Sequence, residues 1–330
     1  MVGLFDSVKI NSLEIKNRIL MAPMATSLAG EQKGEVTDKL IKHYLDRAEK
    51  TGIIITEHNY IDPVGRFHER QMGIYSDTLI PGMKKLVKAV HDYGTPIGIQ
   101  LSHAGGKASS HLIGQPPVAP SPIPLEKETP RELTETQIES LVEKFGQAAE
   151  RALTAEFDLI EIHGAHGFLL NQFYSPITNK RRDNYGGSLK NRIRFPLEVV
   201  KRIRVIVGDN FPLQYRLGSV DLSPGGVSIE DSEVFARELF WAGINSINVS
   251  GGLCGPFPPS LGGEGFFIPQ AEAIKKACKA IVIGGGGITN PEFADKVIRE
   301  KRVDMVFIGR AFLNDPKWAV NAENKLKKYY

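Results

Sequence analysis

Cysteine is scarce in this sequence. The 330 residues include only two, Cys254 and Cys278, and neither belongs to a cluster with metal-ligand spacing. Structural zinc and iron–sulfur sites need several cysteine or histidine ligands at short, characteristic spacings, so no metal site is predicted. Because the chain carries no disulfide framework, it fits a reducing compartment, and we expect a cytoplasmic protein.

Strong net charge and long apolar runs are missing too. The 41 Lys and Arg residues nearly balance 38 Asp and Glu residues and are scattered along the chain, so no nucleic-acid partner is expected. No apolar run approaches the roughly 20 residues of a membrane span, and no membrane association is expected. The N-terminus has no basic segment followed by an apolar core, so we expect no signal peptide.

Short apolar runs alternate with helical patterns along the chain, which predicts an α/β fold with parallel strands. Eight predicted strands, separated by seven predicted helices, favour a closed (β/α)₈ TIM barrel that forms a single domain over residues 1–330. The predicted strands are 19–22, 52–58, 96–101, 157–162, 213–217, 246–250, 281–283 and 304–308. The predicted helices are 37–49, 81–93, 134–153, 192–207, 228–242, 269–279 and 291–300. An open doubly wound sheet is the alternative, weakened because no Gly-x-Gly-x-x-Gly follows the first strand.

Local signals at the ends of these elements add detail. Apolar runs on both sides of Asn11-Ser12 predict an N-terminal hairpin at the bottom of the barrel. Thr37 is a plausible helix N-cap, and Thr134 with Gln137 fits a capping box. A proline-rich loop over 115–124 is expected to be a long excursion from the barrel.

Two histidines follow the fourth predicted strand, in a segment that neighbouring glycines make flexible. His163 and His166 are therefore placed to meet a ligand, although either one alone could cap local hydrogen bonds. With Glu161 they could also be the metal ligands of a barrel hydrolase. That alternative is weaker, because no second cluster completes the ligand shell.

Other polar residues and two glycine-rich turns fall at predicted strand ends, where the sites of such barrels lie. The polar residues are Glu57, His58, Gln100, His103, His163, His166 and Arg216. The turns, 284–287 and Gly309-Arg310, follow strands seven and eight. Glycine lets backbone N–H groups approach phosphate oxygens, and a helix N-terminus adds partial positive charge, so the turns predict a phosphate-bearing ligand.

The stretch 163–192 resembles the signature of the old yellow enzyme family, the flavin-dependent ene-reductases. The resemblance extends over 16–19, 22–24, 98–105, 117–121 and 304–310. It implies non-covalently bound FMN and NADH or NADPH as reductant. By this resemblance the FMN-binding positions are Pro23, Met24, Ala25, His58, Gln100, Arg216, Gly286, Gly287, Gly309 and Arg310.

The resemblance also implies a reaction. His163 and His166 would hold the carbonyl oxygen of an α,β-unsaturated compound, whose β-carbon accepts hydride from flavin N5. Gln100 would bond the pyrimidine edge of the flavin and Arg216 would lie near N1 and O2. Gly286, Gly287, Gly309 and Arg310 would form the phosphate site.

The sequence departs from the family pattern at several positions. Ala25 stands where a cysteine or threonine is usual, and Gly106 where an arginine is common. Phe168 replaces the tyrosine that donates a proton to the α-carbon, so we expect solvent to supply that proton. Other candidate donors are Tyr60, Tyr174 and the C-terminal Tyr329 or Tyr330 of a neighbouring molecule.

Longer relatives continue into an iron–sulfur segment and a dinucleotide-binding domain, neither of which is seen after Arg310. Electrons are therefore expected from free NADH or NADPH, or from a redox partner protein. The sequence is also compatible with a homo-oligomer. A flavin-binding electron-transfer subunit without ene-reductase activity is a further alternative, because Phe168 and Ala25 remove groups that the family uses.

Overall fold

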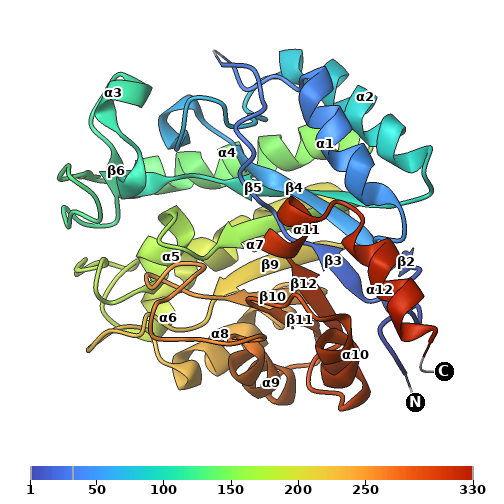
Figure 1. Ribbon diagram of the computed structural model, residues 1–330. Helices are drawn as coiled ribbons and strands as arrows, with labels where there is room; N and C mark the ends of the chain where they lie inside the picture. The colour runs from blue at the N-terminus through green and yellow to red at the C-terminus, as the bar shows by residue number, and fades with distance from the viewer. Residues whose placement is uncertain (1, 32, 329–330) are drawn as a thin grey trace.

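The computed structural model describes residues 2–31 and 33–328, and its centre is a closed barrel of parallel strands (Figure 1). The barrel strands are β3 (Ile19–Met21), β4 (Ile53–Tyr60), β5 (Ile97–Ser102), β8 (Leu159–Gly164), β9 (Leu213–Gly218), β10 (Ser246–Ser250), β11 (Ile281–Gly285) and β12 (Met305–Ile308). Each corresponds to one predicted strand. Because β12 pairs with β3 and closes the ring, the TIM barrel is confirmed and the open doubly wound sheet is wrong.

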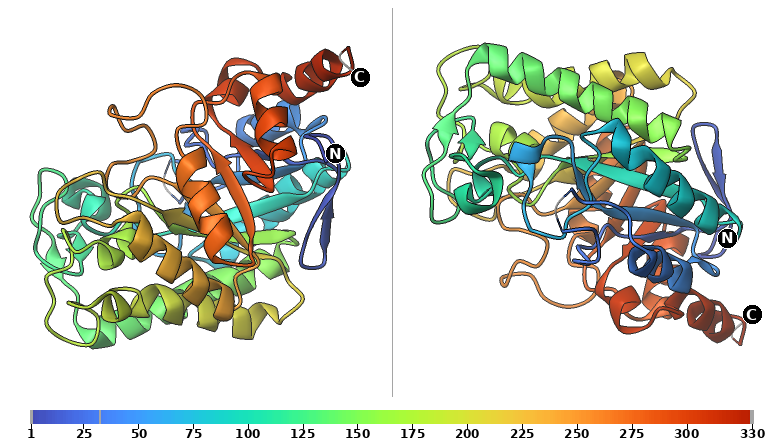
Figure 2. Two further views of the ribbon diagram at one scale, coloured as in Figure 1. Left: turned by 90° about the horizontal axis from the view of Figure 1, so that it is seen from below. Right: turned by 90° about the horizontal axis from the view of Figure 1, so that it is seen from above.

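Helices surround this barrel (Figure 2). Those that were predicted are α1 (Asp38–Ala48), α2 (Ile80–His91), α4 (Glu135–Thr154), α7 (Arg194–Val207), α8 (Ile229–Trp241), α9 (Ile268–Ala277) and α10 (Pro291–Arg299). The predicted caps are confirmed. The Thr37 side chain accepts from the backbone N–H of Leu40, and Thr134 forms a complete capping box with Gln137.

Several short elements had no prediction. They are α3 (Ser110–Ile113), α5 (Leu169–Tyr174), α6 (Leu189–Arg192), α11 (Arg310–Asn314), α12 (Trp318–Leu326) and the 3₁₀ turns η1 (Pro63–Gly65), η2 (Asp77–Leu79) and η3 (Gly105–Lys107). The proline-rich loop contributes β6 (Val118–Ala119), which pairs with β7 (Arg131–Glu132). Except for α12, which is as long as α10, these pieces are too short for hydrophobic periodicity to reveal them. Among the described residues no helix has the length and apolarity to cross a bilayer.

The N-terminal hairpin closes one end of the barrel, as predicted. Strands β1 (Val8–Ile10) and β2 (Leu13–Ile15) are antiparallel. Val8, Ile10 and Ile15 belong to the same buried cluster as Leu20 and Leu159. The hairpin lies at the opposite end of the molecule from α3 and β6 (Figures 1 and 2). The far end of the barrel, where the parallel strands stop, is thereby left for a site.

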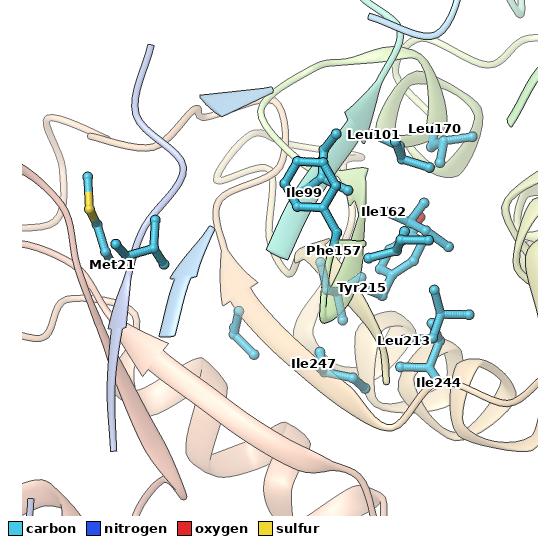
Figure 3. Close-up of a cluster of buried hydrophobic side chains, with 14 of the residues drawn as sticks. Met21, Ile99, Leu101, Phe157, Ile162, Leu170, Leu213, Tyr215, Ile244 and Ile247 are labelled. Atoms are coloured by element: carbon cyan, nitrogen blue, oxygen red, sulfur yellow. The ribbon is translucent and has the colours of Figure 1, made fainter. Parts of the chain in front are cut away.

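Alternation along the strands separates an apolar outer face from the side chains inside the barrel, which are apolar beside the N-terminal hairpin and polar toward the other end. Ile99, Ile162 and Tyr215 belong to the larger core, which packs between the strands and the helices (Figure 3). The residues next to them in the same strands point the other way, because successive side chains of a strand face opposite sides. Gln100 and Glu161 therefore lie inside the barrel.

Candidate active site

Every residue predicted for the site lines one cavity of about 570 Å³. The residues are Pro23, Met24, Ala25, His58, Gln100, His163, His166, Arg216, Gly286, Gly287, Gly309 and Arg310. They come from the ends of strands β3, β4, β5, β8, β9, β11 and β12 or from the loops that follow. Glu57 and His103 do not line the cavity, although both follow the same strand-end rule. A volume of this size is typical of cofactor and small-molecule sites.

A fully buried carboxylate lies inside the barrel, where it holds one of the cavity residues. The carboxylate of Glu161 accepts from Gln100 Nε2 at 2.7 Å, Gln214 Nε2 at 2.5 Å and Asn248 Nδ2 at 2.8 Å. An ionised carboxylate can only accept, so the amide nitrogen of Gln100 must face Glu161. The amide oxygen of Gln100 is then free to accept a hydrogen bond from a ligand. Sequence reasoning missed both Gln214 and Asn248.

This network contradicts the alternative of a metal-dependent hydrolase. Both oxygens of Glu161 already accept from buried amides, so the carboxylate is not available as a ligand beside His163 and His166. Within residues 2–31 and 33–328, no group of three His, Cys, Asp or Glu side chains is arranged to hold a metal ion.

Arg216 has buried hydrogen-bond donors that lack acceptors. Its Nη2 donates to Ser250 Oγ at 3.3 Å, while Nε and Nη1 are buried without a partner. Burial lowers the pKa of this guanidinium, and the charge of Glu161 acts in the opposite direction. An unpaired buried donor costs about 1–3 kcal/mol, so these nitrogens fit a ligand that presents acceptors. The pyrimidine edge of FMN presents such acceptors.

The two glycine turns form another part of the cavity wall. Gly286 and Gly287 have φ of 102° and 67°, the left-handed region in which side chains are strained. A Cβ on Gly286 would lie 2.6 Å from the ring of Phe266. Arg310 begins α11, and its guanidinium lies 4.2 Å from the centroid of the Phe257 ring. Tight backbone with an adjacent cation suits a phosphate group, so the residues present fit FMN.

The histidine pair lies at the carboxyl end of β8, where His163 belongs to the strand and His166 to the loop that follows. The His163 and His166 ring centroids are 5.1 Å apart, and His166 Nε2 lies 2.8 Å from Ser250 Oγ. His166 has a φ of 59°, a conformation uncommon for a non-glycine residue and often found at functional sites. Burial, helped by neighbouring positive groups that include Arg216, holds the pKa of both imidazoles well below the ordinary value. Both rings are therefore neutral near pH 7, so each has one N–H to donate.

A cluster of aromatic rings borders the histidines. The Phe168 ring centroid lies 4.6 Å from that of His163 and 5.2 Å from that of His58. Burial lowers the pKa of His58 to about 3. Phe67 packs 5.3 Å from Phe168, and Lys107 lines the cavity beside both phenylalanines. Neither Phe67 nor Lys107 was predicted, although Lys107 directly follows the unusual Gly106.

The candidate tyrosine proton donors are not at this cluster. Tyr60 is 1% exposed and Tyr174 is fully buried, and neither lines the cavity. The Tyr174 hydroxyl is paired with Ser232 Oγ at 2.8 Å, and burial raises the tyrosine's pKa. Tyr329 and Tyr330 lie outside the described residues. The suggestion that Tyr60 or Tyr174 protonates the substrate is therefore wrong.

Comparison with known protein families assigns the chain. The model of the NADH:flavin oxidoreductase / NADH oxidase family matches residues 3–329. The chain belongs to this family. It is therefore an FMN-dependent oxidoreductase that uses NADH or NADPH, as the sequence motifs imply.

Individual relatives agree with this assignment. The chain is 42% identical to NADH oxidase of Thermoanaerobacter brockii over 99% of its own length, but it spans only 52% of that protein. It is 37% identical to NADPH dehydrogenase of Listeria monocytogenes serotype 4a (strain HCC23), covering 99% of this chain and 96% of the relative.

Solved structures show the same barrel. Morphinone reductase superposes with a TM-score of 0.85 at 31% identity, covering 98% of this chain and 90% of the other. The old yellow enzyme homologue from Zymomonas mobilis gives a TM-score of 0.86 at 27% identity, with 98% and 93% covered. The resemblance to the old yellow enzyme family is confirmed.

Proposed function

We propose that this oxidoreductase reduces the activated C=C bond of α,β-unsaturated carbonyl compounds. The observation that carries the proposal is the pair of neutral, buried imidazoles of His163 and His166. They line the same cavity as Arg216 and the two glycine turns. The cavity therefore combines groups suited to a flavin nucleotide with hydrogen-bond donors suited to a carbonyl oxygen.

Several residues would hold the FMN. Gly286, Gly287, Gly309 and Arg310 would bind its phosphate. Arg216 and the free amide oxygen of Gln100 would meet the pyrimidine edge, since one presents donors and the other an acceptor. Pro23, Met24, Ala25 and the backbone of His58 would lie along the ring system. When bound, FMN supplies the hydride that reduces the β-carbon.

The histidines would act on the substrate oxygen. That oxygen gains negative charge as the C=C bond is reduced, so donors already in place stabilise the transition state more than the ground state. Ser250 Oγ lies 2.8 Å from Nε2 of His166 and forms a hydrogen bond with it. Nδ1 is therefore the nitrogen of this ring that remains to contact the substrate. Because the pKa of each imidazole is far below 7, both rings keep a constant protonation state over the physiological range.

The α-carbon would take its proton from water. Phe168 has no proton to give, and both Tyr60 and Tyr174 lie away from the cavity. A positioned acid contributes about 10²–10⁴-fold to such a step, so the oxidative half-reaction is expected to be slower than with a tyrosine at this position.

Two measurements test the proposal. Denaturing the purified protein should release FMN, and release of FAD or of no flavin would contradict the cofactor site. Added phenols should give a long-wavelength charge-transfer band, because neutral imidazole donors stabilise a phenolate held against oxidised flavin.

Replacing both His163 and His166 by alanine should abolish the band while FMN stays bound. The exposed His111→Ala is the matched control and should leave the band unchanged. A band that persists at equal affinity in the double variant would refute the role of the pair. NAD(P)H-dependent turnover of a simple enone separates the enzyme from a flavin-binding electron-transfer subunit.

A further inference from the structure

The cavity wall carries positive charge that the flavin does not fully use. Its lining includes Lys107, Arg216 and Arg310, and among the residues that the structure describes no carboxylate lines it. In the proposed function Arg216 faces the flavin pyrimidine and Arg310 its phosphate. Lys107 lies beside Phe168, on the side where the histidine pair would hold the substrate. It is therefore the cavity-lining cation without an assigned partner in FMN.

Lys107 is held in place but only partly satisfied by the protein. Its side chain is 22% exposed, and its Nζ donates to the backbone oxygen of His166 at 3.3 Å. The nearby carboxylate of Glu126 is 3.9 Å away, too long for a hydrogen bond, and is itself 55% exposed. An ammonium group carries three N–H donors, so donors of Lys107 remain for a ligand.

Aromatic rings fix where the ammonium lies. Nζ of Lys107 is 5.4 Å from the centroid of the Phe67 ring and 5.7 Å from that of Phe168. Ring faces attract a cation, but they do not replace the hydrogen bonds it loses on leaving water. Burial accordingly lowers the pKa of Lys107, with Glu126 acting in the opposite direction. An anionic ligand group in the cavity would supply the missing acceptors.

We propose that Lys107 forms an anion subsite for a carboxylate or phosphate group on the molecule bound between the histidine pair and the two phenylalanines. The inference rests on the proposed function and narrows it to planar unsaturated carbonyl compounds that carry a negative charge. A phosphate of the nicotinamide dinucleotide is the other source of the same chemistry, because the reductant must reach the same flavin.

Ligand pairs that differ only in charge test the subsite. The probes are 3- and 4-hydroxybenzoate, compared with 3- and 4-hydroxybenzaldehyde, titrated into the oxidised FMN-bound protein by absorbance. The Lys107→Met variant should bind at least one hydroxybenzoate about 10- to 100-fold more weakly, because a hydrogen bond to a charged group is lost. The affinities of the aldehydes should stay within about 2-fold.

Two variants control for other effects. Lys107→Arg keeps the charge and should retain most of the preference for the benzoates. Lys127→Met removes an exposed positive charge from the adjoining loop and should change neither ligand class. Two outcomes in Lys107→Met would overturn the anion subsite. One is an equal loss of affinity for benzoates and aldehydes; the other is unchanged affinity for both ligand classes and for the dinucleotides.

The source of the anion is separated by the reductive half-reaction. Stopped-flow reduction with NADH and NADPH gives their dissociation constants in the wild type and in Lys107→Met. Weakening confined to the dinucleotides assigns the subsite to phosphate, and weakening confined to the hydroxybenzoates assigns it to a substrate carboxylate.

Failure of the proposed function is detected first and independently. If the wild type lacks FMN, or gives no band with the neutral aldehydes, the ene-reductase proposal fails. If both are present and the charge preference is absent, only the Lys107 subsite fails.

Discussion

The buried carboxylate of Glu161 offers the sharpest test of how the barrel supports its cofactor site. Glu161→Gln preserves the shape of the side chain but converts one acceptor oxygen into an NH₂ donor. Gln214 and Asn248 both donate to Oε2, whereas Gln100 alone donates to Oε1. The new amide therefore loses least by turning its nitrogen toward Gln100, which places two donor groups against each other.

The cost of this change follows from the contacts. Leaving a buried donor unsatisfied costs about 1–3 kcal/mol, and a neutral acceptor weakens each of the two remaining hydrogen bonds by about 1 kcal/mol. Together these give about 3–5 kcal/mol, the usual range for breaking a buried charged interaction. For a chain of 330 residues, this corresponds to a fall in Tm of about 4–7 °C.

The same substitution should weaken FMN binding. If the Gln100 amide rotates to relieve the opposed donors, its oxygen turns toward position 161, so part of the stability loss is recovered and the acceptor no longer faces the ligand. Losing one neutral hydrogen bond should weaken FMN affinity about 3- to 10-fold. Calorimetry of the flavin-free protein gives Tm, and fluorescence titration with FMN gives the dissociation constant.

Glu198→Gln is the matched control. Glu198 lies in α7, where it is only partly buried and accepts from the Tyr185 hydroxyl at 3.1 Å, and it does not line the cavity. It should lose at most about 1 kcal/mol of stability and bind FMN normally. An unchanged Tm and FMN affinity in Glu161→Gln, or equal losses in the control, would refute the reasoning.

Three further predictions concern Phe168, His103 and Gly286. Phe168→Tyr should accelerate enone reduction by at least about 10-fold without changing flavin reduction by NAD(P)H, because it restores a proton donor. Stopped-flow kinetics of both half-reactions measures this effect. An unchanged oxidative rate would mean that protonation does not limit turnover. His103 Nδ1 accepts from the backbone N–H of Gly105 at 3.0 Å, and burial lowers its pKa to about 4. Because this folded-state pKa lies below the unfolded value near 6.5, stability from His103 is complete above pH 6.5 and is lost as the pH falls toward 4. Urea unfolding of His103→Asn should therefore show a pH dependence smaller by about 1.4 kcal/mol per pH unit between pH 5 and 6, and an unchanged slope would contradict the buried neutral histidine. Gly286→Ala should weaken FMN binding and lower stability more than Gly208→Ala. Both positions have positive φ, but only at Gly286 would a Cβ meet an aromatic ring. Equal losses of FMN affinity and Tm in the two variants would argue against the tight turn.

The sequence alone predicted the barrel and the end of it at which the candidate site lies. Alternating apolar runs and helical patterns are local signals, and eight repeats leave few topologies available. The strand-end rule then placed His163 and Arg216 near the glycine turns before any contact was known. Side chains at the carboxyl ends of parallel strands must converge when the barrel closes, so these predictions required no knowledge of packing.

Only the tertiary structure decided which polar groups pair inside the barrel. Glu161 meets Gln214 and Asn248 across strands far apart in sequence, and such pairing depends on strand register and barrel closure. The burial of Tyr174 against Ser232 likewise depends on helix packing. The position of Lys107 above Phe168 depends on how a short 3₁₀ turn packs against the loop after β8. Long-range contacts of this kind leave no periodic trace in the sequence, because each pairs single residues brought together by the closed fold.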